Sequence, residues 1–218
     1  MPDPHQPSSE LGSVSAPTHR ALKSAVIRGP TLINVMAMTA KQRKTTAYHE
    51  AGHAVTGRVL TLPCGYATIQ PDYAKAIAGH VITPEPYACL SEWERRGKVR
   101  DSGNAVWYAR IITYMAGAEA EKELLDSTVI GDGDDRDQIA LMAEELPGGA
   151  DWDKLEPRLR AMARMLVRRH RGRIELVARA LLAKTTLSAK ALDKLVGRSV
   201  DDVKVNAPFL LAMHGGAS

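Results

Sequence analysis

The sequence predicts a mainly helical α+β fold with a small β-sheet or hairpin. Its 218 residues are 44% hydrophobic, which is enough for one sizeable buried core. With one Phe, three Trp and six Tyr, that core must consist mainly of Leu, Val, Ile, Met and Ala, and this mixture favours packed helices over a large sheet. Residues 63–86 are instead punctuated by proline and glycine around apolar stretches at 67–69 and 80–82, which predict short strands.

The N-terminal part of the chain predicts a tail followed by one helix. Residues 1–38 are expected to form a disordered tail, because the first 20 are rich in Pro, Ser, His and Gly and lack apolar periodicity. The Ala, Val and Leu positions of residues 47–60 then predict a helix, with Thr45 or Thr46 near its start.

Helical spacing continues through most of the remaining chain. Residues 104–125 and 134–146 predict two helices, the second stopped by a Pro-Gly-Gly sequence. Apolar residues recur at helical spacing over residues 159–181, which predicts one long amphipathic helix with a kink near Gly172. A last short helix is expected over residues 188–196, capped by Ser188.

Charge, cysteines and hydropathy limit the class of protein. The formal charge of +4 permits anionic partners without requiring one. Cys64 and Cys89 form neither a Cys-x-x-Cys pair nor a repeated spacing, so we expect free thiols in a reducing compartment. No run approaches the roughly 18–20 apolar residues that cross a bilayer, and the N-terminus does not resemble a secretory signal. We therefore expect a cytoplasmic protein without a membrane span.

The predicted helix at 47–60 carries a His-Glu-x-x-His motif formed by His49, Glu50 and His53. Residues four apart lie about 40° apart around a helix and about 6 Å along it, so both imidazoles can reach one ion. Zinc accepts histidine nitrogens at about 2.0–2.1 Å in a tetrahedral arrangement, and a catalytic site keeps one position for water. Glu50 is turned roughly 100° from His49 and therefore flanks the ion without binding it.

This placement of Glu50 suits a general base. Zinc lowers the pKa of its bound water toward about 7, and a nearby carboxylate can accept the proton that is released. The resulting hydroxide can attack a carbonyl that zinc polarises, and Glu50 can then protonate the departing amine. The motif therefore predicts a hydrolase with one Zn²⁺ per chain, although two histidines and a glutamate can also be ordinary packed or solvated residues.

A third ligand must come from elsewhere in the chain. The extended metzincin pattern is excluded, because Thr56 and Val59 stand where it requires a glycine and a third histidine. Two sources stay open, a glutamate of the next long helix or the acidic turn that follows it. The eligible residues are Glu119, Glu121 and Glu123 in the helix, and Asp132, Asp134, Asp135 and Asp137 in the turn.

Several segments, in order, resemble one known family. They are residues 46–55 around the histidine motif, Thr68-Ile69-Gln70-Pro71, Gly79-His80-Val81, Ala116-Gly117-Ala118-Glu119-Ala120-Glu121, and Gly131 to Asp135. Each is similar to a segment of the zinc peptidase domain of the membrane-bound AAA+ proteases of the FtsH type. In that family these segments form the active-site helix, the next strand, the substrate-binding edge strand, a Gly-Gly-Arg-Ala-Ala-Glu helix and a Gly-x-x-x-Asp turn. The resemblance covers roughly residues 41–197.

The resemblance implies a zincin-like metalloendopeptidase that cleaves polypeptide substrates. Asp135 would be the third zinc ligand, with Asp134 as the adjacent competitor. Glu121 would orient a ligating imidazole. The strand Gly79-His80-Val81 would bind the substrate. Residues 39–150 would form the zinc-binding peptidase core, residues 151–205 a C-terminal helical part of the same domain, and residues 206–218 a tail.

The sequence also departs from the family. It contains no Gly-x-x-x-x-Gly-Lys-Ser/Thr loop, so we expect a stand-alone peptidase domain that lacks the ATPase module. A separate AAA+ ATPase or self-association would then deliver the extended substrate. Ala116-Gly117-Ala118 replaces the family's Gly-Gly-Arg, and Arg136 replaces the leucine that usually follows the aspartate.

Two other functions compete with hydrolysis. The first is a catalytically inactive zinc-binding scaffold, which Glu50 argues against. The second is nucleic-acid binding through the arginine-rich residues 158–173, which lack aromatic residues to stack on bases. Cys64, Cys89 and His80 have no spacing that fits a compact zinc site, and we expect His80 and His170 to be surface or packing residues.

Overall fold

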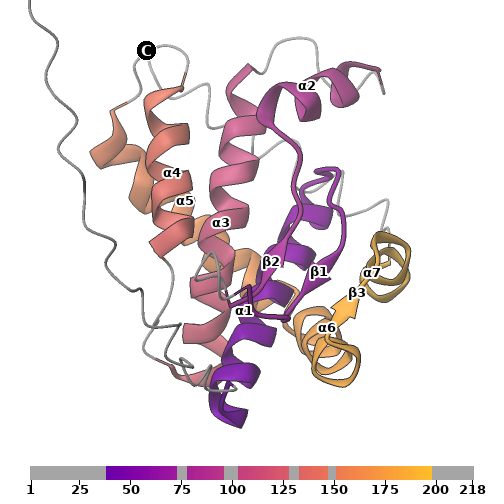
Figure 1. The fold of residues 1–218 in the computed structure, drawn as a ribbon. Coiled ribbons are helices and arrows are strands. Elements are labelled where there is room, and N and C mark those ends of the chain that lie inside the picture. Colours follow the sequence, from indigo (N-terminus) through magenta and orange to yellow (C-terminus); the bar gives the residue numbers. More distant parts are fainter. Residues whose placement is uncertain (1–37, 73–77, 96–102, 128–132, 147–150, 198–218) are drawn as a thin grey trace, which may run out of the picture. The chain divides into compact units, whose positions relative to one another are not determined.

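The computed structural model describes residues 38–72, 78–95, 103–127, 133–146 and 151–197, all of which belong to one compact unit (Figure 1). These residues are mainly helical with a three-stranded antiparallel sheet, which confirms the predicted α+β, mainly α class. No helix among them is long and apolar enough to cross a membrane. Apart from Met38, the two predicted tails lie outside the described residues, as does the predicted Pro-Gly-Gly stop.

The elements follow one another as α1 (Ala40–Val59), β1 (Ala67–Thr68), β2 (His80–Val81), α2 (Pro86–Arg95), α3 (Gly103–Leu125), α4 (Gly133–Glu144), α5 (Trp152–Arg169), α6 (Arg171–Lys184), β3 (Thr186–Leu187) and α7 (Ala189–Val196).

Helix α1 begins seven residues earlier than predicted, because its N-cap is Thr39. The Thr39 side chain accepts a hydrogen bond from the backbone N–H of Gln42, and the Gln42 side chain accepts one from the backbone N–H of Thr39. This capping box satisfies two donors at the helix start and extends the helix ahead of the apolar residues. From Ala47 onward α1 is buried almost continuously, because α3, α6 and the sheet contact it on different sides.

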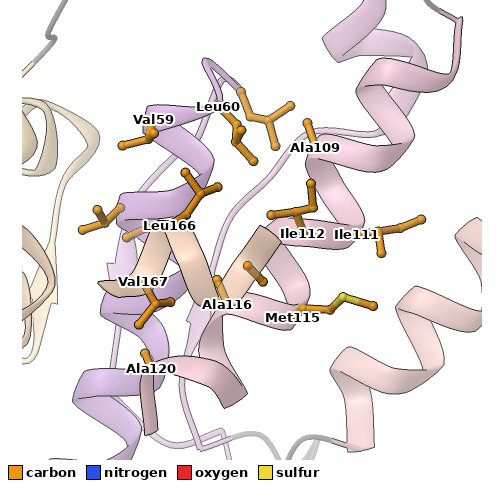
Figure 2. Close-up of a cluster of buried hydrophobic side chains, with 14 of the residues drawn as sticks. Val59, Leu60, Ala109, Ile111, Ile112, Met115, Ala116, Ala120, Leu166 and Val167 are labelled. Carbon is orange, nitrogen blue, oxygen red and sulfur yellow. The ribbon is translucent and has the colours of Figure 1, made fainter. Parts of the chain in front are cut away.

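Helices α1 and α3 approach closely at small residues. Gly52 of α1 faces Ala116 and Ala120 of α3, and a Cβ atom at Gly52 would lie 2.5 Å from the carbonyl oxygen of Ala116. Figure 2 shows buried side chains from α1, α3 and α5 gathered in this part of the core: Val59, Leu60, Ala109, Ile111, Ile112, Met115, Ala116, Ala120, Leu166 and Val167.

The sheet confirms the predicted hairpin and adds a strand that was not predicted. β1 lies in the centre, with Thr68 opposite His80 of β2 on one side and opposite Thr186 of β3 on the other. The prediction missed β3 because this strand has only two residues between two helices, which is too short to show a period. β2 lies at an edge of the described sheet.

Three helix assignments differ from the predictions or refine them. Helix α2 was not predicted; it begins at Pro86, and proline is favoured in the first turn of a helix. The predicted long helix is two helices, separated at His170 rather than kinked near Gly172. His170 is buried, as expected. Helix α7 has the predicted cap, since the Ser188 hydroxyl accepts a hydrogen bond from the N–H of Ala191.

The close contact between α1 and α3 predicts an unusual response to alanine. Alanine normally stabilises a helix interior relative to glycine by about 1 kcal/mol. In Gly52→Ala the new methyl group would meet the backbone of α3, so we expect a net loss of about 1–2 kcal/mol in the free energy of unfolding. Urea unfolding of the metal-free chains measures this change. Gly172→Ala is the control, because nothing lies within 4 Å of its Cβ position, and it should be neutral or stabilising. Equal behaviour of the two variants would contradict the packing argument.

Candidate metal centre

The structure brings together the three residues predicted as metal ligands. The Nε2 atoms of His49 and His53 lie 2.8 Å and 3.2 Å from the same Asp135 oxygen, Oδ2. The two imidazole rings are 4.5 Å apart between centroids and nearly perpendicular. The candidate ligand atoms of the three residues all lie within 4.8 Å of one another, and the side chains are largely shielded from solvent. Their role as ligands stays a prediction.

Helix α4 decides which of the adjacent aspartates faces the histidines. Asp134 and Asp135 both stand in its first turn, where the helix dipole favours carboxylates. Neighbouring residues on a helix point about 100° apart. Asp135 therefore contacts the imidazoles while Asp134 is exposed.

The other candidates for the third ligand have different surroundings. Glu119 is paired with Arg160 and Arg164 of α5, and Glu123 with Arg168. Asp137 is exposed, and Asp132 and Gly131 lie outside the described residues.

The remaining ring nitrogens are held so that both Nε2 lone pairs can point inward. His53 Nδ1 lies 2.7 Å from the backbone oxygen of Thr113, which can only accept, so Nδ1 carries the proton. His49 Nδ1 lies 2.6 Å from Glu121 Oε1, so Glu121 lies where a carboxylate orients a ligating imidazole. Contacts at both Nδ1 atoms thus fix the orientation of the two imidazole rings.

The charges at the centre fit a cation. Burial alone would lower the pKa of His49, but hydrogen bonds to Asp135 and Glu121 raise it to about 10. Burial likewise opposes ionisation of Asp135, yet the nearby charge of His53 and the bonds to both histidines hold the pKa of this carboxyl well below its usual range. A divalent ion would replace the imidazole protons, which are released when a metal binds histidine.

The donor set and the available space also fit zinc. Two imidazole nitrogens and one carboxylate oxygen are a common ligand set of catalytic zinc. Tetrahedral ligands at zinc distances stand about 3.3 Å apart, close to the observed 2.8 Å and 3.2 Å contacts. A Cβ atom at Gly117 would lie 2.5 Å from His53 Nε2 and 2.6 Å from His49 Nε2, so this position admits only glycine.

Glu50 is buried beside the three residues without a complete set of partners. It is 4% exposed, and its Oε2 atom has no hydrogen-bond partner among the described residues. Burial raises the pKa of Glu50 to about 7, although the positive charges of His53 and His49 oppose this shift. A carboxyl group with a pKa near neutrality and a free oxygen is suited to accept and return a proton.

A cavity of about 300 Å³ opens over these groups, within the usual size range of small-molecule sites. Glu50, Asp135 and both histidines line it together with the predicted substrate strand. The other lining residues are Thr45, Thr46, Ala78, Gly79, His80, Val81, Thr83, Thr113, Tyr114, Glu121, Asp134 and Gln138.

The predicted substrate strand passes directly over Glu50. A Cβ atom at Gly79 would lie 2.9 Å from Glu50 Oε1 and 2.7 Å from the backbone oxygen of Thr68. His80 pairs with Tyr66, whose hydroxyl lies 2.9 Å from His80 Nε2. His80 is not in the described group of candidate metal ligands.

Three residues of α3 at the centre were not singled out from the sequence. Thr113 contributes only a backbone oxygen, which no sequence pattern reveals. Tyr114 contacts the His53 ring edge to face, with 6.1 Å between centroids. Gly117 did leave a signal, because glycine inside a long helix costs about 1 kcal/mol and calls for a packing or functional reason.

Comparisons with known proteins do not assign the chain to a family. No family model matches the sequence, and no curated protein matches it. The functional argument therefore depends on the geometry of the centre and on the motif that produces it.

Metal content tests the ligand set. We expect the purified wild-type chain to bind zinc stoichiometrically and Asp135→Ala to lose it, because two imidazoles alone leave the ion without its carboxylate. Asp134→Ala is the matched control and should keep the metal. Elemental analysis after dialysis gives the answer, and full zinc content in Asp135→Ala would remove this residue from the site.

Zinc affinity tests the supporting carboxylate. Glu121→Gln keeps the size of the side chain but weakens the bond to His49 Nδ1, so we expect zinc to bind about 10–100 times more weakly. Competition with a chromogenic chelator measures this change. Glu123→Gln, two residues along the same helix and paired with Arg168, should leave the affinity unchanged. Equal affinities in the two variants would refute the supporting role.

Proposed function

We propose that this protein is a zinc metalloendopeptidase in which Glu50 is the general base. One observation carries the proposal: a buried carboxylate with a free oxygen lies beside two imidazoles and an aspartate that converge on one point. The resemblance to the FtsH-type peptidase domain supports the same assignment, including a zincin-like fold, and remains part of the proposal.

The residues of the chain divide the chemistry among them. Zinc, when bound by His49, His53 and Asp135, supplies a Lewis acid and lowers the pKa of a coordinated water. Glu50 Oε2 accepts a proton as the attacking water is activated, and returns it to the amine that leaves. The burial that raises the pKa of Glu50 makes both transfers accessible near neutral pH.

Strand β2 is the proposed substrate platform. It pairs with β1 on one side and lies at an edge of the described sheet, so its other side can add an extended peptide through main-chain hydrogen bonds. Gly79, His80 and Val81 also line the cavity, which would place a peptide on this edge next to Glu50. The substrates would be unfolded segments or exposed termini.

Partners and location complete the proposal. A separate AAA+ ATPase or self-association would deliver the extended substrate to the site, since residues 1–218 contain no P-loop. Cys64 and Cys89 are free cysteines, which agrees with a reducing compartment such as the cytoplasm.

The competing functions have weaker support. Three of the arginines proposed to contact nucleic acid are engaged within the chain, since Arg160, Arg164 and Arg168 all pair with glutamates of α3. A zinc-binding scaffold would give no reason for a buried carboxylate that lacks a partner.

Replacing the base separates an enzyme from a scaffold. Glu50→Gln keeps the side chain's shape but cannot accept a proton, so we expect the rate of peptide cleavage to fall by a factor of about 10²–10⁴ with zinc content unchanged. Fluorogenic peptides and an unfolded protein substrate report the rate. The control is Glu144→Gln, an exposed change on α4 that should have no effect. A zinc-loaded wild type that cleaves none of these substrates would favour the scaffold.

A further inference from the structure

Arg110 of α3 is a buried cation without a counter-ion in the described part of the chain. The residue is only 3% exposed, and its Nε and Nη1 atoms have no hydrogen-bond partner there. An unpaired buried charge destabilises a folded protein strongly, and guanidinium groups in such places normally face a carboxylate or phosphate. The proposed chemistry at Glu50 does not use this residue.

The Arg110 side chain lies against the Tyr114 ring. Its guanidinium carbon lies 5.8 Å from the centre of the Tyr114 ring, which in turn contacts His53 and lines the active-site cavity. Residues 110, 114 and 117 are spaced four and three apart, so they share one face of α3. Arg110 therefore belongs to the same helix face as Gly117, one aromatic ring away from the cavity.

A second unpaired donor lies one turn earlier on this face. Trp107 is 3% exposed, and its Nε1–H group has no partner among the described residues. An indole N–H can only donate, and so can a guanidinium. An anionic group with several oxygens could accept hydrogen bonds from both of these buried donors.

No hydrogen bond or ion pair joins Arg110 to a carboxylate of the described residues, although Glu85 acts electrostatically on Cys89 as Arg110 does. The charged groups of Arg110 act electrostatically on Cys64 and Cys89, but burial raises the pKa of the Cys64 thiol to about 12 and that of Cys89 above its usual value, so both are neutral. The glutamates farther along α3 are already bound to arginines of α5 or to His49. A ligand with a carboxylate could supply the acceptor that the described residues leave open.

We propose that Arg110 and Trp107 form a carboxylate subsite that selects peptide substrates with an acidic group near the bond to be cut. The inference deepens the proposed peptidase function and rests on it. The planar guanidinium matches a carboxylate in geometry as well as charge. The carboxylate would reach it from the cavity past the Tyr114 ring, and it belongs either to an Asp or Glu side chain or to a free C-terminus.

Peptide binding to the inactive, zinc-loaded Glu50→Gln chain tests the subsite without relying on turnover. One arm compares amidated peptides that carry Glu or Gln at each position in turn, and the other compares free with amidated C-termini. In at least one arm we expect the peptide with the carboxylate to bind tenfold or more tightly, as charge-assisted hydrogen bonds in a desolvated site imply. The arm that responds identifies the source of the carboxylate.

The preference must depend on Arg110. Adding Arg110→Met to the Glu50→Gln chain should abolish it, whereas Arg179→Met, the same change at an exposed position of α6, should preserve it. Removing an unpaired charge should also leave the urea midpoint of the free chain unchanged or raise it. Three results would each overturn the subsite: no carboxylate preference in either arm, a preference that survives Arg110→Met, or a large fall in the urea midpoint of Arg110→Met.

The two proposals fail in different ways. A wild-type chain that cleaves no peptide, combined with an Arg110-dependent binding preference, would remove the peptidase function and keep the subsite. Efficient cleavage that ignores acidic groups, with equal binding of the matched peptides, would do the reverse.

Discussion

The close approach of α1 and α3 is the constraint on which the candidate metal centre depends. Each helix contributes a glycine to it: Gly52 of α1 leaves room for the backbone of α3, and Gly117 of α3 leaves room for the imidazoles of α1. At this separation the Thr113 carbonyl reaches His53 Nδ1 and the Glu121 carboxylate reaches His49 Nδ1. A side chain at either glycine would force the helices or the rings to move, and with them the point on which both Nε2 atoms converge. The orientation of the rings is thus a result of helix packing.

Features that depend on local sequence were predictable from it. Features that depend on how the helices and strands are placed and rotated relative to one another were not. The spacing of His49 and His53, the helix at 104–125 and the Ser188 cap each follow from a period or a capping rule. The choice of Asp135 over Asp134 depends on where α4 begins and how it is turned toward α1, which the motif leaves open and only the family resemblance suggested. Strand β3 exists because β1 offers it a partner, and Thr113 acts through its backbone. No side-chain pattern encodes either.

The charged residues of α3 have different partners on its two faces. Toward α5, Glu119 and Glu123 neutralise arginines that looked from the sequence like a basic surface. Toward α1, Glu121 contacts the His49 imidazole, and on the same side the Nε and Nη1 atoms of buried Arg110 have no hydrogen-bond partner among the described residues. A single helix thereby packs against α5 on one face and borders the candidate metal centre on the other, and its burial is nearly continuous from residue 105 to 121.

Gly79, next to β2, brings the backbone of the proposed substrate strand close to the side chain of Glu50, the proposed general base. A Cβ atom at this position would lie 2.9 Å from Glu50 Oε1 and 2.7 Å from the Thr68 carbonyl oxygen, so there is no room for a methyl group. The backbone just before β2 therefore lies close to the Glu50 carboxylate and restricts the space in which it can turn. A peptide that adds to the edge of β2 would hold this backbone segment more rigidly. Binding of the substrate would then also restrict the movement of Glu50, the proposed general base.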